Sequence, residues 1–288
     1  MPPTRTLGDA EIFPIGLGGM PLSLRGRPDE DRAIRTIHAA LDAGITLIDT
    51  ADAYAYDGDD VGHNERLIAK ALRGRRDGVI VATKGGHTRE GESWALDGRP
   101  EHIRAACEAS LRALETDVID LYQYHRPDPD VPYAETIGAF KQLQDEGKVR
   151  WVGVSNANTE QLDAARAIVD VVSVQNQLAL DFTSPLAKGE VRYAEEHGLA
   201  FLPWSPLGGI GRAGGTADVT PVVAASEAHG VSPQQVALAW LLALSPRVVP
   251  IPGASRPETI ADSARAAELA LSEDELQAIS AAVGAGSG

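Results

Sequence analysis

The chain alternates short runs of β-branched and other apolar residues with longer stretches in which apolar residues recur every three or four positions. Runs of the first kind are typical of buried strands, and stretches of the second kind are typical of amphipathic helices. The pattern predicts eight strands that end in Ile15–Gly18, Thr46–Asp49, Val79–Thr83, Val118–Tyr124, Trp151–Val154, Val171–Gln175, Ala200–Pro203 and Val248–Ile251. Such regular alternation favours an α/β fold with parallel strands.

Several intervening stretches show helical spacing clearly. Ile34, Ile37 and Leu41 share one helix face, and Gly44 follows them as a stop signal. Comparable apolar stripes are Ile103, Cys107, Leu111 and Leu114, and then Ile137, Phe140 and Leu143, which Gly147 closes. Two helical stretches, Thr220–His229 and Ser232–Leu244, precede the last strand. We therefore expect one or two helices beyond the usual one per strand.

Eight strand–helix units in a chain of 288 residues match the size of a (β/α)₈ barrel, the TIM barrel. The competing α/β architecture is a doubly wound sheet, which carries a GxGxxG motif after its first strand when it binds dinucleotides. Here Gly16-Leu17-Gly18-Gly19 follows the first strand, but Met20 and Pro21 interrupt that motif. The sequence therefore predicts a single barrel domain over residues 1–288.

The two ends of the chain lie outside the repeat. Residues 1–14 have the pattern of a β-hairpin that turns at Gly8-Asp9, and we expect this hairpin to plug the bottom of the barrel. The small residues at 284–288 predict a flexible tail.

Composition and charge narrow the class of protein. A net charge of −15 disfavours nucleic acid and anionic membrane as partners, because binding to phosphates needs a basic surface. The sequence has no apolar stretch long enough to span a membrane and no secretory signal, and its one cysteine is Cys107. We expect a cytoplasmic protein, a monomer or small homo-oligomer, that acts on a small molecule.

Four polar residues follow consecutive predicted strands. Asp49 ends the second strand, Tyr54 lies in the loop after it, Lys84 ends the third, and His125 ends the fourth. Because active sites of TIM barrels form at the carboxyl ends of the strands, these side chains should meet on one rim. A lysine ammonium beside a tyrosine lowers the pKa of the phenol, and a carboxylate can hold that lysine. The set therefore predicts proton transfer by Tyr54, with His125 orienting a substrate oxygen.

The chain also resembles a known family. The similar runs, in order, are GLGGM, GITLIDTADAY, HNE at His63–Glu65, ATKGG, IDLYQYHRPDP, GKVRWVGVSN, VQNQL, FLPWSPLGG and PIPGASRPE. They extend from about Gly16 to Leu271 and resemble the aldo-keto reductase superfamily. The resemblance implies a reductase of aldehydes or ketones that uses NADPH, with Asp49, Tyr54, Lys84 and His125 as a catalytic tetrad and Tyr54 as the general acid.

The same resemblance implies a cofactor site along the rim. Ser155, Asn156 and Gln175 match residues that hold the nicotinamide carboxamide, and Trp204 matches an aromatic residue that stacks on the ring. The full predicted set is Gly18, Gly19, Met20, Asp49, Ser155, Asn156, Gln175, Trp204, Ser205, Pro206, Leu207, Gly209, Arg212, Gly253, Ala254, Ser255, Arg256, Thr259, Asp262 and Ser263. For the substrate we predict Tyr54, Trp94, His125 and Arg126. Trp94 lies in the segment Thr88–Pro100, which we expect to form a long loop or lid after the third strand.

The chain departs from the better-known members where they bind the 2′-phosphate of NADP. Those members carry a lysine and an arginine at positions that are Gly253 and Thr259 here, and Asp262-Ser263 replaces a Glu-Asn pair. Arg256 or Arg212 offers a substitute cation for the phosphate. We therefore favour NADP over NAD. The closing stretch also resembles pyridoxal reductases of the superfamily, so pyridoxal is one candidate among many carbonyl substrates.

Alternative functions remain open from the sequence. The β subunits of voltage-gated potassium channels resemble the same family, so an NADPH-binding, redox-sensing protein is the second hypothesis. A Schiff-base lysine at Lys84 is a third. The remaining histidines, His87 among them, show no paired metal-ligand spacing, so we predict no metal and treat them as solvated or core-edge residues. Cys107 lies on an apolar helix face and is expected to be buried.

Overall fold

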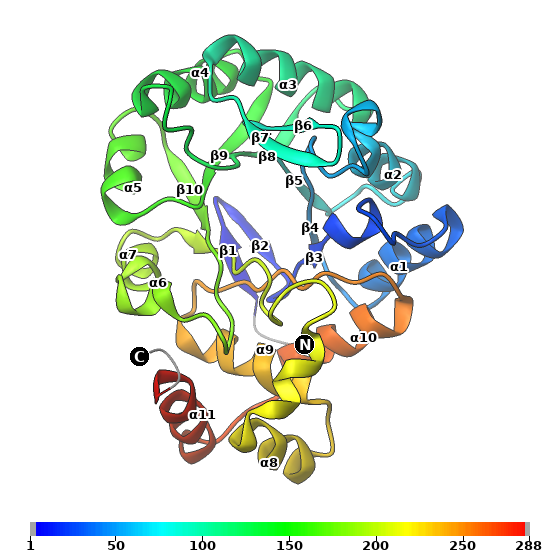
Figure 1. The fold of residues 1–288 in the computed structure, drawn as a ribbon, viewed down its shortest axis with the longest axis vertical. Coiled ribbons are helices and arrows are strands. Elements are labelled where there is room, and N and C mark those ends of the chain that lie inside the picture. Colours follow the sequence, from blue (N-terminus) through cyan, green and yellow to red (C-terminus); the bar gives the residue numbers. More distant parts are fainter. Residues whose placement is uncertain (1–3, 286–288) are drawn as a thin grey trace.

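The computed structural model describes residues 4–285, which form a curled parallel sheet inside a ring of helices (Figure 1). The strands of the sheet run in the order β11-β10-β9-β8-β5-β4-β3. Their bounds are β3 Leu17–Gly18, β4 Leu47–Asp49, β5 Ile80–Gly85, β8 Ile119–Tyr124, β9 Val149–Ser155, β10 Val171–Gln175 and β11 Ala200–Phe201. Seven of the eight predicted strands are therefore confirmed, each within a few residues.

The eighth predicted strand, Val248–Ile251, closes the barrel without forming a regular strand. It bonds to β11 on one side, and on the other Gly16 and Gly18 donate to the carbonyls of Pro250 and Pro252, both at 2.9 Å. Proline has no N–H, so these two residues accept hydrogen bonds from the first strand and return none. The hydrogen bonds that Pro250 and Pro252 cannot donate are therefore missing between this segment and the first strand. For this reason the regular sheet has seven strands although the barrel is closed.

The helices follow the predicted alternation. They are α1 Glu30–Asp42, α2 His63–Ala71, α3 Pro100–Ala113, α4 Tyr133–Asp145, α5 Thr159–Arg166, α6 Ser184–Ala187, α7 Glu190–Glu196, α8 Thr220–His229, α9 Pro233–Leu244, α10 Pro257–Arg265 and α11 Glu273–Ala285. Short 3₁₀ turns lie at η1 Met20–Leu22, η2 Gly58–Asp60, η3 Ala213–Asp218 and η4 Ala266–Glu268. The two helices expected before the last strand are α8 and α9.

The N-terminal hairpin lies at the amino-terminal end of the barrel strands. β1 Arg5–Leu7 pairs antiparallel with β2 Ala10–Ile12 across the predicted Gly8-Asp9 turn. Leu7 and Ile12 are fully buried in one apolar cluster with residues at or near the starts of several barrel strands, including Leu47 and Ile80. The opposite, carboxyl end of the strands is therefore the free face on which a site can form.

Two local expectations were wrong. α11 continues to Ala285, so the first two residues of the tail predicted at 284–288 are helical, and residues 286–288 lie outside the described part. The segment Thr88–Pro100, expected as a loop or lid, contains a hairpin of β6 His87–Glu90 and β7 Ser93–Leu96. Both strands of this hairpin are exposed or only partly buried, so they lack the alternation of apolar and polar residues that predicts a strand.

Candidate active site

Lys84 lies at the centre of the predicted tetrad and is completely buried at the end of β5. Its ammonium nitrogen Nζ lies 2.6 Å from Asp49 Oδ1, 2.8 Å from the Thr50 carbonyl oxygen and 3.1 Å from the Tyr54 hydroxyl. A protonated lysine has three N–H donors, and these three acceptors use all of them. The Tyr54 oxygen is therefore an acceptor toward Lys84, and its own O–H proton remains for another partner.

Asp49 is fixed by amide side chains as well as by Lys84. Gln175 Nε2 donates to Asp49 Oδ2 at 2.7 Å, and Gln123 Nε2 donates to the same oxygen at 3.2 Å. Gln123 lies in β8 opposite Lys84 in the parallel register. The sequence reasoning missed Gln123, although a polar residue two positions before His125 in a strand lies on the same face and could have indicated it.

The buried environment sets the protonation of these groups. Burial raises the pKa of Tyr54 above its ordinary value, and the nearby Lys84 ammonium offsets only part of this effect. Burial alone would lower the pKa of Lys84, but Asp49 and Tyr54 together outweigh burial and raise that pKa. Lys84 does lower the pKa of Tyr54, as expected, but the phenolate loses its hydration at this depth, so the net shift of that pKa is upward. Both groups stay protonated at neutral pH.

His125 faces Tyr54 and stacks on a second imidazole. The ring centroids of His125 and Tyr54 are 5.7 Å apart, and those of His125 and His87 are 4.1 Å apart with nearly parallel planes. Burial and the positive charge of Lys84 lower the pKa of His125 well below its ordinary value. Burial, and then Arg126, lower the pKa of His87 to about 4. Both imidazoles are therefore neutral at pH 7.

His87 corrects the expectation of a solvated or core-edge histidine. It lines the cavity, and neither ring nitrogen has a hydrogen-bond partner in the described residues. Its ring also meets Trp94 edge-on, with the centroids 5.4 Å apart. The only sequence signal was its place three residues after Lys84, at the end of a barrel strand.

Residues of α2 support the strand ends from behind. Asn64 accepts a hydrogen bond from Thr50 Oγ1 at 2.6 Å and donates to the Gly19 carbonyl at 2.8 Å. Glu65 accepts from Thr83 Oγ1 at 2.6 Å, next to Lys84 in β5. Two of the three residues in the HNE run therefore tie the ends of β3, β4 and β5 together.

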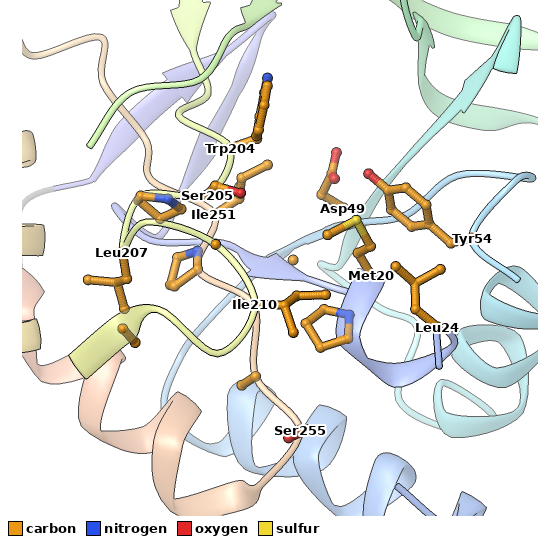
Figure 2. A pocket seen from close by; sticks show the side chains of 18 of the residues that line it. Met20, Leu24, Asp49, Tyr54, Trp204, Ser205, Leu207, Ile210, Ile251 and Ser255 are labelled. Atoms are coloured by element: carbon orange, nitrogen blue, oxygen red, sulfur yellow. The ribbon is translucent and has the colours of Figure 1, made fainter. Parts of the chain in front are cut away.

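A cavity of about 1120 Å³ opens beside this cluster at the carboxyl ends of the strands. In Figure 2, Asp49 and Tyr54 lie at one end of the view and Ser255 at the other, with Ile210 between them. The volume is slightly larger than the range of about 300–1,000 Å³ that is usual for pockets that take drug-sized ligands. An elongated ligand larger than most drugs, such as a dinucleotide, fits these dimensions.

Most of the predicted site residues line this cavity. They are Gly18, Met20, Asp49, Tyr54, Trp94, His125, Arg126, Ser155, Asn156, Gln175, Trp204, Ser205, Pro206, Leu207, Gly209, Gly253, Ala254, Ser255, Arg256, Thr259, Asp262 and Ser263. Lys84 lies beneath the surface, behind Tyr54. Lining residues that the sequence reasoning did not predict include Pro21, Leu24, Ile210, Gln234 and Glu258.

Two predicted cofactor residues do not line the cavity. Gly19 is buried, and a Cβ at this position would lie 2.5 Å from Asn64 Oδ1, so the glycine permits packing rather than contact with a ligand. Arg212 points to the surface, where its side chain is 73% exposed and Nη2 lies 3.5 Å from Asp181 Oδ2. Of the two cations offered for a 2′-phosphate, the cavity therefore contains Arg256 alone.

The chain around the cavity fits a nucleotide in several respects. Trp204 Nε1 is buried beside the cavity without a partner among the described residues. Ser205 has a φ of 50°, so the loop after β11 holds a backbone conformation that is unusual for a residue other than glycine and persists only with surrounding support. Ser255 and Arg256 directly precede α10, whose N-terminus attracts anions.

The polar side chains after β9 link the two sides of the site. Asn156 has a φ of 56°, and its amide nitrogen donates to the His125 carbonyl at 2.9 Å and to Ser155 Oγ at 3.0 Å. Ser155 Oγ donates to the Gln175 carbonyl at 2.8 Å. These contacts connect β8, β9 and β10 at one level of the rim.

Residues 4–285 offer little support for a metal site, a membrane-spanning helix or a reactive cysteine. No group of three or more histidine, cysteine, aspartate or glutamate side chains there is placed to bind a metal ion. No helix among those residues is long and apolar enough to cross a membrane. Cys107 is buried, and burial raises the pKa of its thiol to about 12, which makes it a poor nucleophile.

The fold and the site define a TIM-barrel oxidoreductase that uses a nicotinamide cofactor, and comparison with known proteins identifies the family. Residues 14–283 match the model of the aldo/keto reductase family, so this chain belongs to that family. A soybean (Glycine max) protein named probable aldo-keto reductase 1 is 33% identical, and the match covers 95% of this chain and 86% of the relative.

Solved structures give the same result. The glycerol dehydrogenase AKR11B4 from Gluconobacter oxydans has a TM-score of 0.83 and 28% identity, and the match covers 99% of this chain and 96% of that one. An aldo-keto reductase from Klebsiella pneumoniae, solved with NADPH, has a TM-score of 0.82 and 29% identity, with 98% and 95% covered.

Proposed function

We propose that this protein reduces aldehydes or ketones to alcohols with NADPH, and that Tyr54 is the general acid. The observation that carries the proposal is the saturation of Lys84. Its three N–H donors point to Asp49, the Thr50 carbonyl and Tyr54, so the Tyr54 O–H proton is left for a ligand in the cavity. When bound, the cofactor supplies the hydride that adds to the carbonyl carbon.

The chain's own residues account for the proton. Tyr54 gives its proton to the carbonyl oxygen, and its raised pKa keeps that proton in place until a basic oxygen arrives. The Lys84 ammonium stabilises the phenolate that forms, and Asp49 holds Lys84 in position. The neutral His125 can hydrogen-bond the same carbonyl oxygen and orient it toward Tyr54.

The cofactor would lie along the cavity from Asp49 to α10. Ser155, Asn156 and Gln175 would hold the nicotinamide carboxamide, and Trp204 would stack on the ring. The loop after β11 would cover the pyrophosphate. Ser255, Arg256 and Thr259 would bind the 2′-phosphate, which is the basis for favouring NADPH over NADH.

The geometry argues against a Schiff-base mechanism at Lys84. A lysine nucleophile must be neutral and reachable, whereas this side chain is fully buried and carries a raised pKa. All three of its hydrogens are also engaged, so attack on a carbonyl would require the Asp49 contact to break.

Titration of the protein with NADPH and NADH, followed by cofactor fluorescence, tests the first step. A panel of aldehydes and ketones with the preferred nucleotide then tests turnover through loss of NADPH absorbance. We expect tighter binding of NADPH than of NADH and reduction of several aldehydes. Tight binding of NADPH without reduction of any carbonyl would contradict the proposal and favour a redox-sensing role.

A further inference from the structure

Arg126 is an arginine of the cavity wall that lacks a counter-ion. It directly follows His125 at the end of β8 and lines the cavity that also contains Tyr54. Its Nη2 donates to Asn156 Oδ1 at 3.1 Å, and it forms no ion pair within residues 4–285. Surface arginines such as Arg73 and Arg75 do have carboxylate partners, at 2.6 Å and 2.5 Å.

Arg126 and Lys84 are the cations closest to the stacked imidazoles in their effect, although the protein as a whole is strongly acidic. The charges that act on both stacked imidazoles, His87 and His125, come from Arg126 and Lys84. The carboxylate of Asp49 is already paired with Lys84 at 2.6 Å, so it does not neutralise Arg126. In a chain of net charge −15, an arginine on the cavity wall that has no carboxylate partner among the described residues calls for a ligand that supplies the missing anion.

We propose that the site prefers carbonyl compounds that carry a carboxylate group, and that Arg126 is the specificity-determining residue that binds this group. The planar guanidinium matches a carboxylate in shape and can donate two parallel hydrogen bonds to it. His87, whose ring nitrogens have no partner among the described residues, lies on the same wall and can donate to a further substrate oxygen. The inference rests on the proposed reductase function and adds the chemical class of the substrate.

The expected size of the preference follows from exposure. Arg126 is exposed to solvent, so water and salt weaken its attraction for a carboxylate. Exposed ion pairs contribute little binding free energy in general. We therefore expect the contact with Arg126 to change kcat/KM by about fivefold. The effect should shrink when the ionic strength rises.

Matched substrates and a matched control test the inference. We would measure kcat/KM for 4-carboxybenzaldehyde and for its neutral methyl ester, methyl 4-formylbenzoate, with wild type, Arg126→Gln and Arg150→Gln. Arg150 pairs with Asp9 at 2.8 Å, on the hairpin at the other end of the barrel, so its loss changes the net charge equally without touching the cavity. We expect the ratio of carboxylate to ester to fall about fivefold in Arg126→Gln and by less than twofold in Arg150→Gln.

Equal ratios in wild type and Arg126→Gln would overturn the inference while leaving the reductase function intact. Reduction of neither aldehyde would instead count against the proposed function, and a binding experiment then decides the inference separately. Benzoate and benzamide are titrated onto the protein with NADP⁺ present, and tryptophan fluorescence, to which Trp94 in the cavity wall contributes, is followed. Tighter binding of benzoate in wild type, lost in Arg126→Gln, supports the inference; equal binding of the two ligands overturns it.

Discussion

The two ends of the cavity are built in different ways. At the catalytic end, Asp49 and Lys84 come from strand ends, are nearly inaccessible to solvent, and have a partner for each charged atom. At the α10 end, Ser255, Arg256 and Thr259 come from a loop and a helix N-terminus and are at least partly exposed. The first end is held by the barrel itself, whereas the second is held by a surface element.

Under the proposed function, this difference separates proton transfer at one end from the choice between NADPH and NADH at the other. Proton transfer requires that the donor and acceptor be positioned to within a few tenths of an ångström. Strand ends that are joined by backbone hydrogen bonds can maintain this precision. Selection between NADPH and NADH depends on one phosphate in partly aqueous surroundings, where several residues can supply the charge. Gly253 and Thr259, where the resemblance implies a lysine and an arginine in better-known members, also lie at the α10 end.

The largest effect should come from removing the proton donor. Tyr54→Phe keeps the ring and removes the hydroxyl that lies 3.1 Å from Lys84, so turnover should fall by about 10²- to 10⁴-fold. NADPH binding, measured by fluorescence, should change little because the ring still fills its place. A variant that retains more than a tenth of wild-type kcat would show that Tyr54 is not the general acid.

Removing the buried cation should affect the stability of the fold as well as activity. Lys84→Met leaves Asp49 buried with amide donors but no counter-ion, which costs about 3–5 kcal/mol in the free energy of unfolding. Denaturant titration measures this loss. The double variant Lys84→Met/Asp49→Asn removes both charges and should recover a large part of it. If the double variant is no more stable than the single one, the ion pair is not the cause.

At the α10 end the expected effects on NADPH affinity are smaller, and two substitutions should change it in opposite directions. Arg256→Gln should weaken NADPH binding about fivefold and NADH binding less, because only NADPH carries the 2′-phosphate. Glu258→Gln should strengthen NADPH binding, since this carboxylate lines the same part of the cavity. Arg265→Gln, in the last turn of α10, is the control. Equal changes for both nucleotides in Arg256→Gln would place the phosphate elsewhere.

A further effect concerns the pH dependence of stability and again distinguishes the buried end. Burial raises the pKa of Glu65 to about 7, whereas an unfolded glutamate titrates near ~4.3. Between these values the folded state holds a proton that the unfolded state has lost, so this contribution to stability is present below ~4.3 and falls as pH rises toward 7. Wild type should therefore lose stability relative to Glu65→Gln by up to ~1.4 kcal/mol per pH unit.

Unfolding midpoints of wild type and Glu65→Gln from pH 5 to pH 8 measure this difference. The wild-type midpoint should fall relative to that of Glu65→Gln up to about pH 7, and above that pH the two curves should run parallel. Curves that are parallel throughout would mean that Glu65 titrates normally. Arg256 is exposed and lies at the α10 end of the cavity, so it serves as the comparison with Glu65. The variant Arg256→Gln should leave the pH dependence of the unfolding midpoint unchanged.

Much of the fold could be predicted from the sequence because its signals are local. The apolar stripe of Ile34 and Ile37 produces α1, and the apolar runs before Asp49 and Lys84 produce β4 and β5. Parallel strands joined by helices bring their carboxyl ends to one rim, so the meeting of Asp49, Tyr54, Lys84 and His125 follows from strand order alone. The last strand was harder, since Pro250 and Pro252 take part in the barrel without the hydrogen bonds that define a strand.

The sequence by itself thus determined the repeat, the rim and the residue types on it, because spacing and turn signals act over a few residues. Tertiary structure alone decided which side chains form hydrogen bonds with one another and which are buried. It placed Gln123 on Asp49, stacked His87 on His125, turned Arg212 toward Asp181, and raised the pKa of Tyr54 where proximity to Lys84 had indicated the opposite. Hydration and side-chain pairing depend on atoms from distant parts of the chain, and no local pattern encodes them.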